Sequence, residues 1–390
     1  MRIEQLHRRV VNGVGRVEME VHWEDVDREP FRLFFETEER LSGHLNPDPN
    51  AALIACALPA FRDGERRIAI EGSVCPVLAR NIDVVYARVT MWSSEQSGTP
   101  PVVEPSAGFS AKDPPEGGQS MALTSGGIDS LATLRWNMLN VPSSHERSIK
   151  ALAFVAFYPD WDPSAALLQG RTGRRRPAID AVAAELGAEV IPIRTNSWEL
   201  ADGGHFFNDR WHGAAFVSAA AFCGAPYRRA YLAAGQDPWV DVPWGSHPML
   251  DPYYSSAHLT VEHDLMISRF EKTRLVGGWK VGRDNIRVCQ NDSAGSYNCG
   301  TCEKCIRTSL TLLVQGQLDS KSLPRDVSPE VVALLDEYEM ISPLPGYLEY
   351  YDVLVPELRS VGRGDLAEAL QDVLDKTRSR YGVSPEPTPQ

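Results

Sequence analysis

The sequence lacks a long apolar run and a signal-peptide pattern. A membrane-spanning helix needs roughly 18 or more apolar residues in succession, and no segment approaches that length. The first residues, 1–9, carry several charged side chains and no apolar core of a secretory signal. We therefore expect no membrane partner and a cytoplasmic location. Hydrophobic residues make up 43% of the 390 positions, as in an ordinary globular protein with room for two domains.

The sequence also lacks an excess of positive charge. Its 39 basic and 52 acidic residues leave a net charge of −13 at pH 7. Proteins with a large nucleic-acid footprint normally show a basic face. The one basic cluster is Arg-Thr-Gly-Arg-Arg-Arg at residues 171–176, which we expect to be a solvated loop. The partner expected from this composition is a small-molecule substrate rather than a nucleic acid, and a homodimer stays open.

Isolated cysteines are few. Cys56, Cys75 and Cys223 each lie alone in an apolar context, which predicts buried structural thiols. The other four cysteines form one cluster with the spacing Cys-x9-Cys-x2-Cys-x2-Cys, namely Cys289, Cys299, Cys302 and Cys305. In a cytosolic chain such clustering favours a metal site over disulfide bonds.

Four thiolates suit a closed, tetrahedral zinc site, in which no coordination position remains for water. Gly300 gives the loop freedom to wrap an ion, and Cys305 opens an apolar helix over residues 306–314. We therefore expect Zn²⁺ in a structural role. An iron–sulfur cluster and a redox pair are the alternatives that the same cysteines allow.

The stretch Ser-Gly-Gly-Ile-Asp-Ser, residues 125–130, follows the apolar run 121–123 and precedes a helical pattern over 131–139. A strand, a glycine-rich turn and a helix in that order place backbone N–H groups at a helix N-terminus, where an anion is favoured. Gly126 and Gly127 allow a phosphate to approach closely. Thr124, Ser125 and Ser130 add hydroxyl groups, and Asp129 adds a carboxylate suited to Mg²⁺.

No lysine follows these glycines, so the stretch is not a Walker A loop. The plainer alternative is that Ser-Gly-Gly is only a turn and that Asp129 and Ser130 cap the helix.

Residues 1–95 are expected to form a small N-terminal α+β domain. Alternation over 14–23 predicts a strand, with 31–35 as its hairpin partner, and 51–61 predicts an apolar helix. A further strand is expected over 83–91. Residues 96–118 are rich in Ser, Pro and Gly and predict a linker. Residues 321–390 are expected to be a helical extension, with helices over 329–338 and 366–377.

From residue 119 the pattern alternates between strands and helices. Strands are expected at the positions 119–123, 151–158, 189–193 and 229–233, with helices at 179–186 and 211–222 between them. This alternation predicts an α/β fold with a doubly wound, Rossmann-like parallel sheet over 119–320.

Ligands of such sheets bind at the carboxyl ends of the strands. Residues 158–160, 195–196 and 235–237 would join the glycine-rich turn at that edge. Phe157 and Tyr158 would wall an adenine or else pack in the core. Gln236 and Asp237 would lie near the nucleotide, although an isolated Asp is also a common loop cap.

The hexapeptide Ser125–Ser130 resembles the PP-loop signature, Ser-Gly-Gly-x-Asp-Ser, of the ATP pyrophosphatases. With the cysteine cluster downstream, residues 119–315 resemble the 7-cyano-7-deazaguanine (preQ0) synthase branch of that superfamily. The resemblance implies a PP-loop that grips the pyrophosphate of ATP, cleavage between the α and β phosphates, and adenylation of a carboxylate that ammonia then attacks. It also implies a structural zinc.

In PP-loop enzymes, basic side chains from the region after the sheet often reach the phosphates. The resemblance therefore makes Arg269 and Lys272 candidates for stabilising the departing pyrophosphate, beside Asp129 and Ser130 as the other candidate catalytic residues. Each basic residue alone is more often a surface charge.

The chain departs from preQ0 synthases in carrying about 118 residues before the PP-loop and about 75 after the cysteine helix. The segment between Asp237 and Cys289 also does not match their substrate-binding stretch, so the resemblance does not carry the substrate over.

The function expected from these signals is an ATP- and Mg²⁺-dependent ligase or amidase that forms an acyl-adenylate. Sulfur transfer by one of the clustered cysteines, and a non-catalytic nucleotide-binding module of a larger assembly, are the two alternatives.

Overall fold

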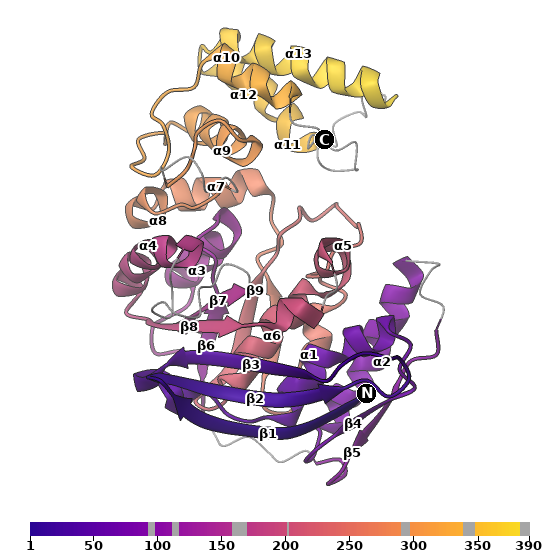
Figure 1. The fold of residues 1–390 in the computed structure, drawn as a ribbon. Helices are drawn as coiled ribbons and strands as arrows, with labels where there is room; N and C mark the ends of the chain where they lie inside the picture. Colours follow the sequence, from indigo (N-terminus) through magenta and orange to yellow (C-terminus); the bar gives the residue numbers. More distant parts are fainter. Residues whose placement is uncertain are drawn as a thin grey trace. The chain divides into compact units, whose positions relative to one another are not determined.

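The computed structural model describes residues 1–92, 98–110, 117–157, 170–200, 203–289, 297–337 and 348–382 (Figure 1). The chain forms two compact units. Unit 1 consists of Met1–Ser125, Asn137–Gly235 and Pro243–Leu265, and unit 2 consists of Gly126–Trp136, Gln236–Val242 and Met266–Gln390. The described part of unit 1 holds a ten-stranded sheet in the order β10-β9-β6-β7-β8-β3-β2-β1-β4-β5, so the fold is α/β with a large, mostly parallel sheet.

The N-terminal strands form an antiparallel meander. β1 (Arg2–Val11) pairs with β2 (Val14–His22), and β2 pairs with β3 (Phe31–Glu38). The sequence predicts the pair of β2 with β3 but not β1. Asn12 and Gly13 both have positive φ in the two-residue turn between β1 and β2. An Asn-Gly pair in that conformation matches the twist of the two strands, which explains the tight hairpin.

The strand expected over residues 83–91 is wrong, because α2 (Pro76–Trp92) is one continuous helix. Its buried side chains, Leu78, Ile82, Val85, Tyr86 and Val89, recur every three or four residues. This helical spacing buries one face, and it overrides the strand preference of Val and Tyr. The neighbouring helix α1 (Pro49–Arg62) is buried along most of its length, as its apolar sequence predicts.

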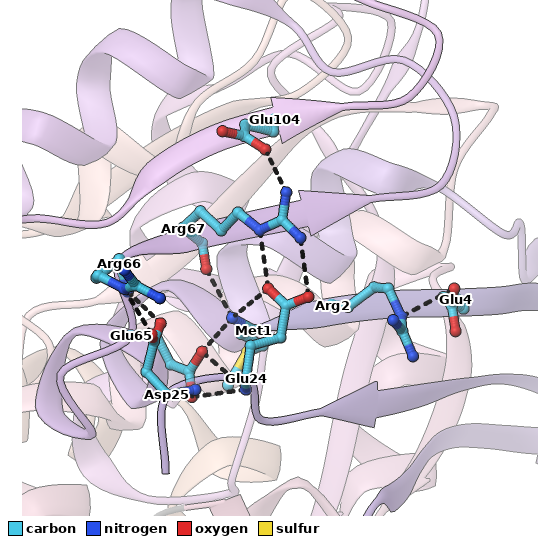
Figure 2. Close-up of polar contacts among 9 residues, drawn as sticks. All are labelled: Met1, Arg2, Glu4, Glu24, Asp25, Glu65, Arg66, Arg67 and Glu104. Carbon is cyan, nitrogen blue, oxygen red and sulfur yellow. Dashed lines mark hydrogen bonds and ion pairs between the residues drawn. The ribbon is translucent and has the colours of Figure 1, made fainter.

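The predicted linker contains a strand. β5 (Val102–Pro105) pairs in parallel with β4 (Arg67–Ile70), and β4 pairs in parallel with β1. Beside these strands the buried carboxylate of Glu65 accepts hydrogen bonds from the Met1 amino group and from the backbone N–H of Glu24 (Figure 2). Arg67 bridges Glu24 and Glu104 next to them. This ionic network fastens the start of β1 to the β4–β5 edge.

The second half of the sheet is parallel. Its strands are β6 (Gln119–Leu123), β7 (Ile149–Phe157), β8 (Glu189–Thr195), β9 (Tyr227–Ala233) and β10 (Thr260–Asp264). The first four are predicted from the sequence and the fifth is not. β6 lies between β7 and β9, so the strand order reverses at β6, and open α/β sheets bind ligands at such a switch point.

One sheet joins the N-terminal strands to the parallel strands. β3 pairs antiparallel with β8 through Phe35 with Thr195 and Glu36 with Arg194. The Asn196 side chain accepts a hydrogen bond from the backbone N–H of Phe34 at 2.9 Å and supports the same junction. The strands β1 to β4 therefore extend the sheet of unit 1 beyond its parallel half.

The arginine-rich segment at 171–176 lies in α4 (Gly170–Leu186) rather than in the expected loop. Arg176 pairs with Asp180 at 2.7 Å and with Glu38 at 2.9 Å, which explains why its charge is accommodated in a helix. The three isolated cysteines are buried as predicted, and burial raises the pKa of the Cys56 and Cys223 thiols to about 12.

Unit 2 is helical in its described part. Its helices beyond α3 are α7 (Arg269–Gly277), α8 (Lys280–Asp284), α9 (Glu303–Val314), α10 (Pro329–Ala333), α11 (Glu349–Asp352), α12 (Leu354–Ser360) and α13 (Gly364–Tyr381). Side chains such as Leu310 of α9, Leu358 of α12 and Leu370 of α13 share one apolar core. The helix expected over 366–377 is present as α13, whereas of the helix expected over 329–338 only 329–333 form α10, followed by a 3-10 turn over Leu334–Asp336. Among the helices of the described residues, none is long and apolar enough to cross a membrane.

Candidate functional site

The glycine-rich turn joins β6 to α3 (Ile128–Asn140), as the sequence predicts. Gly126 has a φ of +75°, a left-handed conformation that strongly favours glycine. Its carbonyl accepts a hydrogen bond from the backbone N–H of Arg287 at 2.8 Å. The backbone of the turn is therefore tight at Gly126 and is fastened there to the segment that carries Arg287.

The hydroxyl-bearing residues of the turn differ in their surroundings. In unit 1, Thr124 is buried and its backbone N–H donates to the carbonyl of Ala153 at 2.9 Å, whereas Ser125 is exposed. In unit 2, the buried Ser130 donates from its hydroxyl to the carbonyl of Gly127 at 3.2 Å. This last bond lies within the first turn of α3, where the hydroxyl donates to the carbonyl three residues earlier. An N-cap side chain would instead accept a bond from a backbone N–H, so this contact is not the cap that the plainer interpretation predicts.

The carboxylate of Asp129, in the first turn of α3, faces two basic side chains of α7. Nη2 of Arg269 donates to Oδ2 of Asp129 at 2.9 Å, and Nζ of Lys272 lies 3.6 Å from Oδ1. Arg269 and Lys272 are three residues apart on one helix, so both reach the same carboxylate. Three of the predicted catalytic residues therefore come together in unit 2.

Lys272 carries its charge in a buried position, with only 1% of its side chain exposed. Burial lowers the pKa of the Lys272 ammonium, the charge of Asp129 raises it, and the charge of Arg269 lowers it again. The net direction is downward from the usual value for lysine. An anion placed beside Lys272 would offset this penalty, because opposite charge favours the protonated form.

Asp237 lies at the start of α7. Its Oδ1 accepts a hydrogen bond from the backbone N–H of Arg269 at 2.7 Å. Burial raises the pKa of the Asp237 carboxyl, and the bond from Arg269 opposes that shift. Gln236, the preceding residue, accepts a hydrogen bond from the hydroxyl of Tyr350 at 3.4 Å. Asp237 thus bonds the first backbone N–H of α7, as the cap alternative predicts, and it lies beside Arg269 and Lys272.

α9 adds two basic residues to this group, Lys304 and Arg307, which are not among the site residues predicted from the sequence. The Nε of Arg307 lies 3.2 Å from Oε1 of Glu303. Burial lowers the pKa of Lys304, and the charges of Arg269 and Arg307 lower it further. No described residue forms an ion pair or hydrogen bond with the Lys304 ammonium. The available signal was the spacing Lys304-x-x-Arg307, which places both side chains on one face of a helix.

Unit 2 therefore gathers several cations in a chain whose net charge is −13. The basic cluster, as we call it below, consists of Arg269, Lys272, Lys304 and Arg307. The carboxylates of Asp129, Asp237 and Glu303 lie beside these four cations and balance three of their four charges. Partly buried guanidinium and ammonium groups bind multiply charged anions strongly, since both the charges and the hydrogen bonds act at low dielectric.

The four clustered cysteines come together as the sequence predicts. The sulfur atoms of Cys289, Cys299, Cys302 and Cys305 all lie within 4.8 Å of one another. Sγ of Cys299 is 4.0 Å from Sγ of Cys305, and Sγ of Cys302 is 3.8 Å from Sγ of Cys289. A tetrahedral ion with metal–sulfur bonds of about 2.3 Å needs sulfur atoms about 3.8 Å apart. These four residues could therefore hold a metal ion.

Polar groups around the cysteines hold the sulfur atoms in place. The backbone N–H of Cys302 donates to Sγ of Cys299 at 3.2 Å, and the N–H of Cys299 donates to Sγ of Cys289 at 3.5 Å. A hydrogen bond from the Cys305 thiol lowers the pKa of Cys302 to about 5, and the same bond raises the pKa of Cys305. Such donors favour the thiolate form that a metal ion requires.

Asn298 and Gly300 shape the backbone of this site. The Asn298 side chain accepts from the N–H of Cys289 at 3.1 Å and donates to the carbonyl of Ser322 at 2.6 Å, so it fastens two chain segments together. Gly300 has a φ of +80°, and a Cβ there would lie 2.5 Å from Cγ of Pro324. The predicted role of Gly300 thus has a specific steric reason.

Phe157 belongs to unit 1, at the end of β7. Its ring contacts the rings of Phe207 and Phe216 at centroid distances of 5.3 and 5.0 Å. These contacts are those expected of the core-packing alternative. Tyr158, the other predicted adenine neighbour, lies outside the described residues.

Comparison with protein-family models, with curated proteins and with solved structures found no match to this chain.

Proposed function

We propose that this protein is an ATP- and Mg²⁺-dependent enzyme that cleaves ATP to AMP and pyrophosphate and adenylates a carboxylate or carbonyl group. Ammonia or an amine is the proposed nucleophile. The observation that carries the proposal is the pairing of Asp129 with Arg269 and Lys272, directly after the glycine-rich turn that opens α3. A resemblance in a hexapeptide alone would not require these three side chains to meet.

The basic cluster is suited to the pyrophosphate part of ATP. Arg269 presents a planar guanidinium that can bind two oxygens, and Lys272 presents a buried point charge. Both stabilise an anion more strongly as its charge increases, which is what occurs when pyrophosphate leaves an α-phosphate. Charge stabilisation and positioning would then supply most of the catalysis, with no side-chain nucleophile.

Asp129 fits a role in holding Mg²⁺. Its Oδ2 is paired with Arg269, whereas its Oδ1 accepts no hydrogen bond from any residue that the structure describes. Carboxylate oxygens are the ligands that Mg²⁺ prefers, together with phosphate oxygens. A bound Mg²⁺ would supply charge neutralisation of the phosphates.

We also propose that the four cysteines hold a structural Zn²⁺. The sulfur separations match a closed tetrahedral site, and four thiolates leave no position for a catalytic water. α9 begins at this site and carries Lys304 and Arg307. The metal would thus fix the helix that contributes half of the basic cluster.

The proposal is tested by incubating the protein with ATP, Mg²⁺, ammonium and a panel of carboxylic acids, and by quantifying AMP and pyrophosphate. We expect both products in equal amounts with at least one acid, and we expect them to be absent with Asp129→Ala. Lys280→Met is the matched control, because Lys280 is exposed and pairs with Asp284. ATP that binds without forming AMP under any of these conditions would count against the proposal.

A further inference from the structure

Three successive residues of the short helix α11 (Glu349–Asp352) bond to other segments of unit 2. The side chain of Glu349 accepts a hydrogen bond from Nε1 of Trp239. The hydroxyl of Tyr350 donates to Oε1 of Gln236 at 3.4 Å, and the hydroxyl of Tyr351 donates to Oε1 of Glu303. All of these residues belong to unit 2. The C-terminal region therefore does more than extend the apolar core.

Tyr350 has the most informative position of the three. The guanidinium carbon of Arg307 lies 4.9 Å from the centre of its ring, and that of Arg269 lies 5.7 Å from the same centre. A cation within about 6 Å of an aromatic face is attracted to it. One buried ring thus contacts both arginines of the basic cluster.

The surroundings of Tyr350 keep its hydroxyl neutral. Burial raises the pKa of Tyr350 to about 12, while the charge of Arg269 lowers it and that of Asp237 raises it. At neutral pH the ring therefore carries no charge that would compete with an incoming anion for the arginines. Tyr351 acts on the same group indirectly, because Glu303 also pairs with Arg307 at 3.2 Å.

We propose that Tyr350 is a positioning residue of the anion site. Its ring holds the guanidinium groups of Arg269 and Arg307 in the orientation that binds the pyrophosphate part of ATP. An arginine that is already ordered loses less side-chain entropy when it binds an anion. This inference rests on the proposed function, and it assigns a role to the C-terminal region.

Isothermal titration of the full chain with pyrophosphate and with Mg²⁺–ATP tests the inference. We expect Tyr350→Leu to raise the Kd for both ligands about five- to tenfold, because both cation–π contacts are lost. Tyr350→Phe keeps the ring and should stay within about twofold of the wild type. Rescue by phenylalanine separates positioning by the ring from the hydrogen bond to Gln236.

Two control variants address stability. Tyr381→Leu removes an exposed tyrosine of α13, and Leu358→Ala loosens the apolar core that α12 shares with Tyr350 while leaving the tyrosine ring in place. Both should leave the Kd values unchanged. Equal Kd values for the wild type and Tyr350→Leu would overturn the inference, and so would a loss of affinity in Leu358→Ala as large as that in Tyr350→Leu. Either result would leave the proposed function standing. A wild type that binds neither ligand would overturn the proposed function, and the inference would fail with it.

Discussion

Arg269 donates hydrogen bonds to two carboxylates, those of Asp129 and Asp237. Only the bond to Asp129 involves the guanidinium group, which is the group that would bind a phosphate. Nη2 of Arg269 lies 2.9 Å from Oδ2 of Asp129, while the backbone N–H of Arg269 donates to Oδ1 of Asp237. The pair joins the first turn of α3 to the first turn of α7. A phosphate that binds Arg269 must therefore compete with Asp129 or be bridged to it by a metal ion.

The Asp129→Asn variant separates these two possibilities. Without Mg²⁺, we expect pyrophosphate to bind about two- to fivefold more tightly than to the wild type, because a partly exposed competing carboxylate is removed. With Mg²⁺ and ATP, we expect AMP formation to fall at least about a hundredfold, because the proposed metal ligand is lost. Calorimetry and product analysis measure the two effects. Weaker pyrophosphate binding together with lower AMP formation, or tighter binding together with undiminished AMP formation, would contradict the proposed role of Asp129.

The buried charge of Lys272 predicts a pH effect on binding. The pKa of Lys272 is lowered in the folded protein. At pH values between that pKa and the ordinary pKa of lysine, the unfolded chain therefore binds more protons than the folded chain. The free energy of unfolding rises with pH in this range. An anion that binds beside Lys272 raises its pKa again. Lys272 should therefore take up protons when pyrophosphate binds, at pH values between its pKa in the free protein and its higher pKa in the complex.

Titrations in buffers of different ionisation enthalpy measure this uptake. Lys272→Met should lose the uptake and about tenfold or more of the affinity. Its free energy of unfolding at neutral pH should be unchanged or higher, because a buried charge is replaced by an apolar chain of similar length. Proton uptake that persists in Lys272→Met would show that another group is responsible.

The proposed metal site predicts one tightly bound zinc ion per chain, measured by mass spectrometry of the purified protein. Asn298→Ala should weaken zinc binding about 10- to 100-fold, because Asn298 fastens the segments that carry the cysteines. Asn137→Ala is a matched control, since Asn137 is similarly buried and also bonds two backbone groups. Iron at this site, or equal zinc affinity in both variants, would argue against the assignment.

Gly300 and Gly316 form a second matched pair. Both have positive φ, but a Cβ at Gly300 would lie 2.5 Å from Pro324, and a Cβ at Gly316 would meet nothing within 4 Å. We expect Gly316→Ala to lower the free energy of unfolding by about 1 kcal/mol, the backbone cost alone. Gly300→Ala should lower it by about 2–4 kcal/mol, because the clash adds to that cost. Urea denaturation measures both, and equal losses would contradict the steric argument.

The sequence predicted the parts of the fold that depend on local pattern. The alternation in β2, the apolar run of β7 and the turn between β6 and α3 all follow from neighbouring residues. The cysteine site was predictable for the same reason, since its ligands lie within one short stretch and their spacing reports the chemistry.

Features that depend on distant contacts were not predictable in this way. Residues 83–91 predict a strand because their Val and Tyr residues favour strands, yet they belong to α2, whose buried face has helical spacing. The junction of β3 with β8 joins residues some 160 positions apart, and nothing in either strand specifies the partner. Lys304 and Arg307 were missed because their significance arises only when α9 lies beside Arg269.

The most direct test of the central claim is a crystal structure of the protein with Mg²⁺ and an ATP analogue whose α–β bridge resists cleavage. We predict that the β- and γ-phosphates lie within hydrogen-bonding distance of Arg269 and Lys272, at the N-terminus of α3, with the metal ion on Asp129. A nucleotide bound elsewhere in the protein, with the Asp129–Arg269 pair unchanged, would contradict the account.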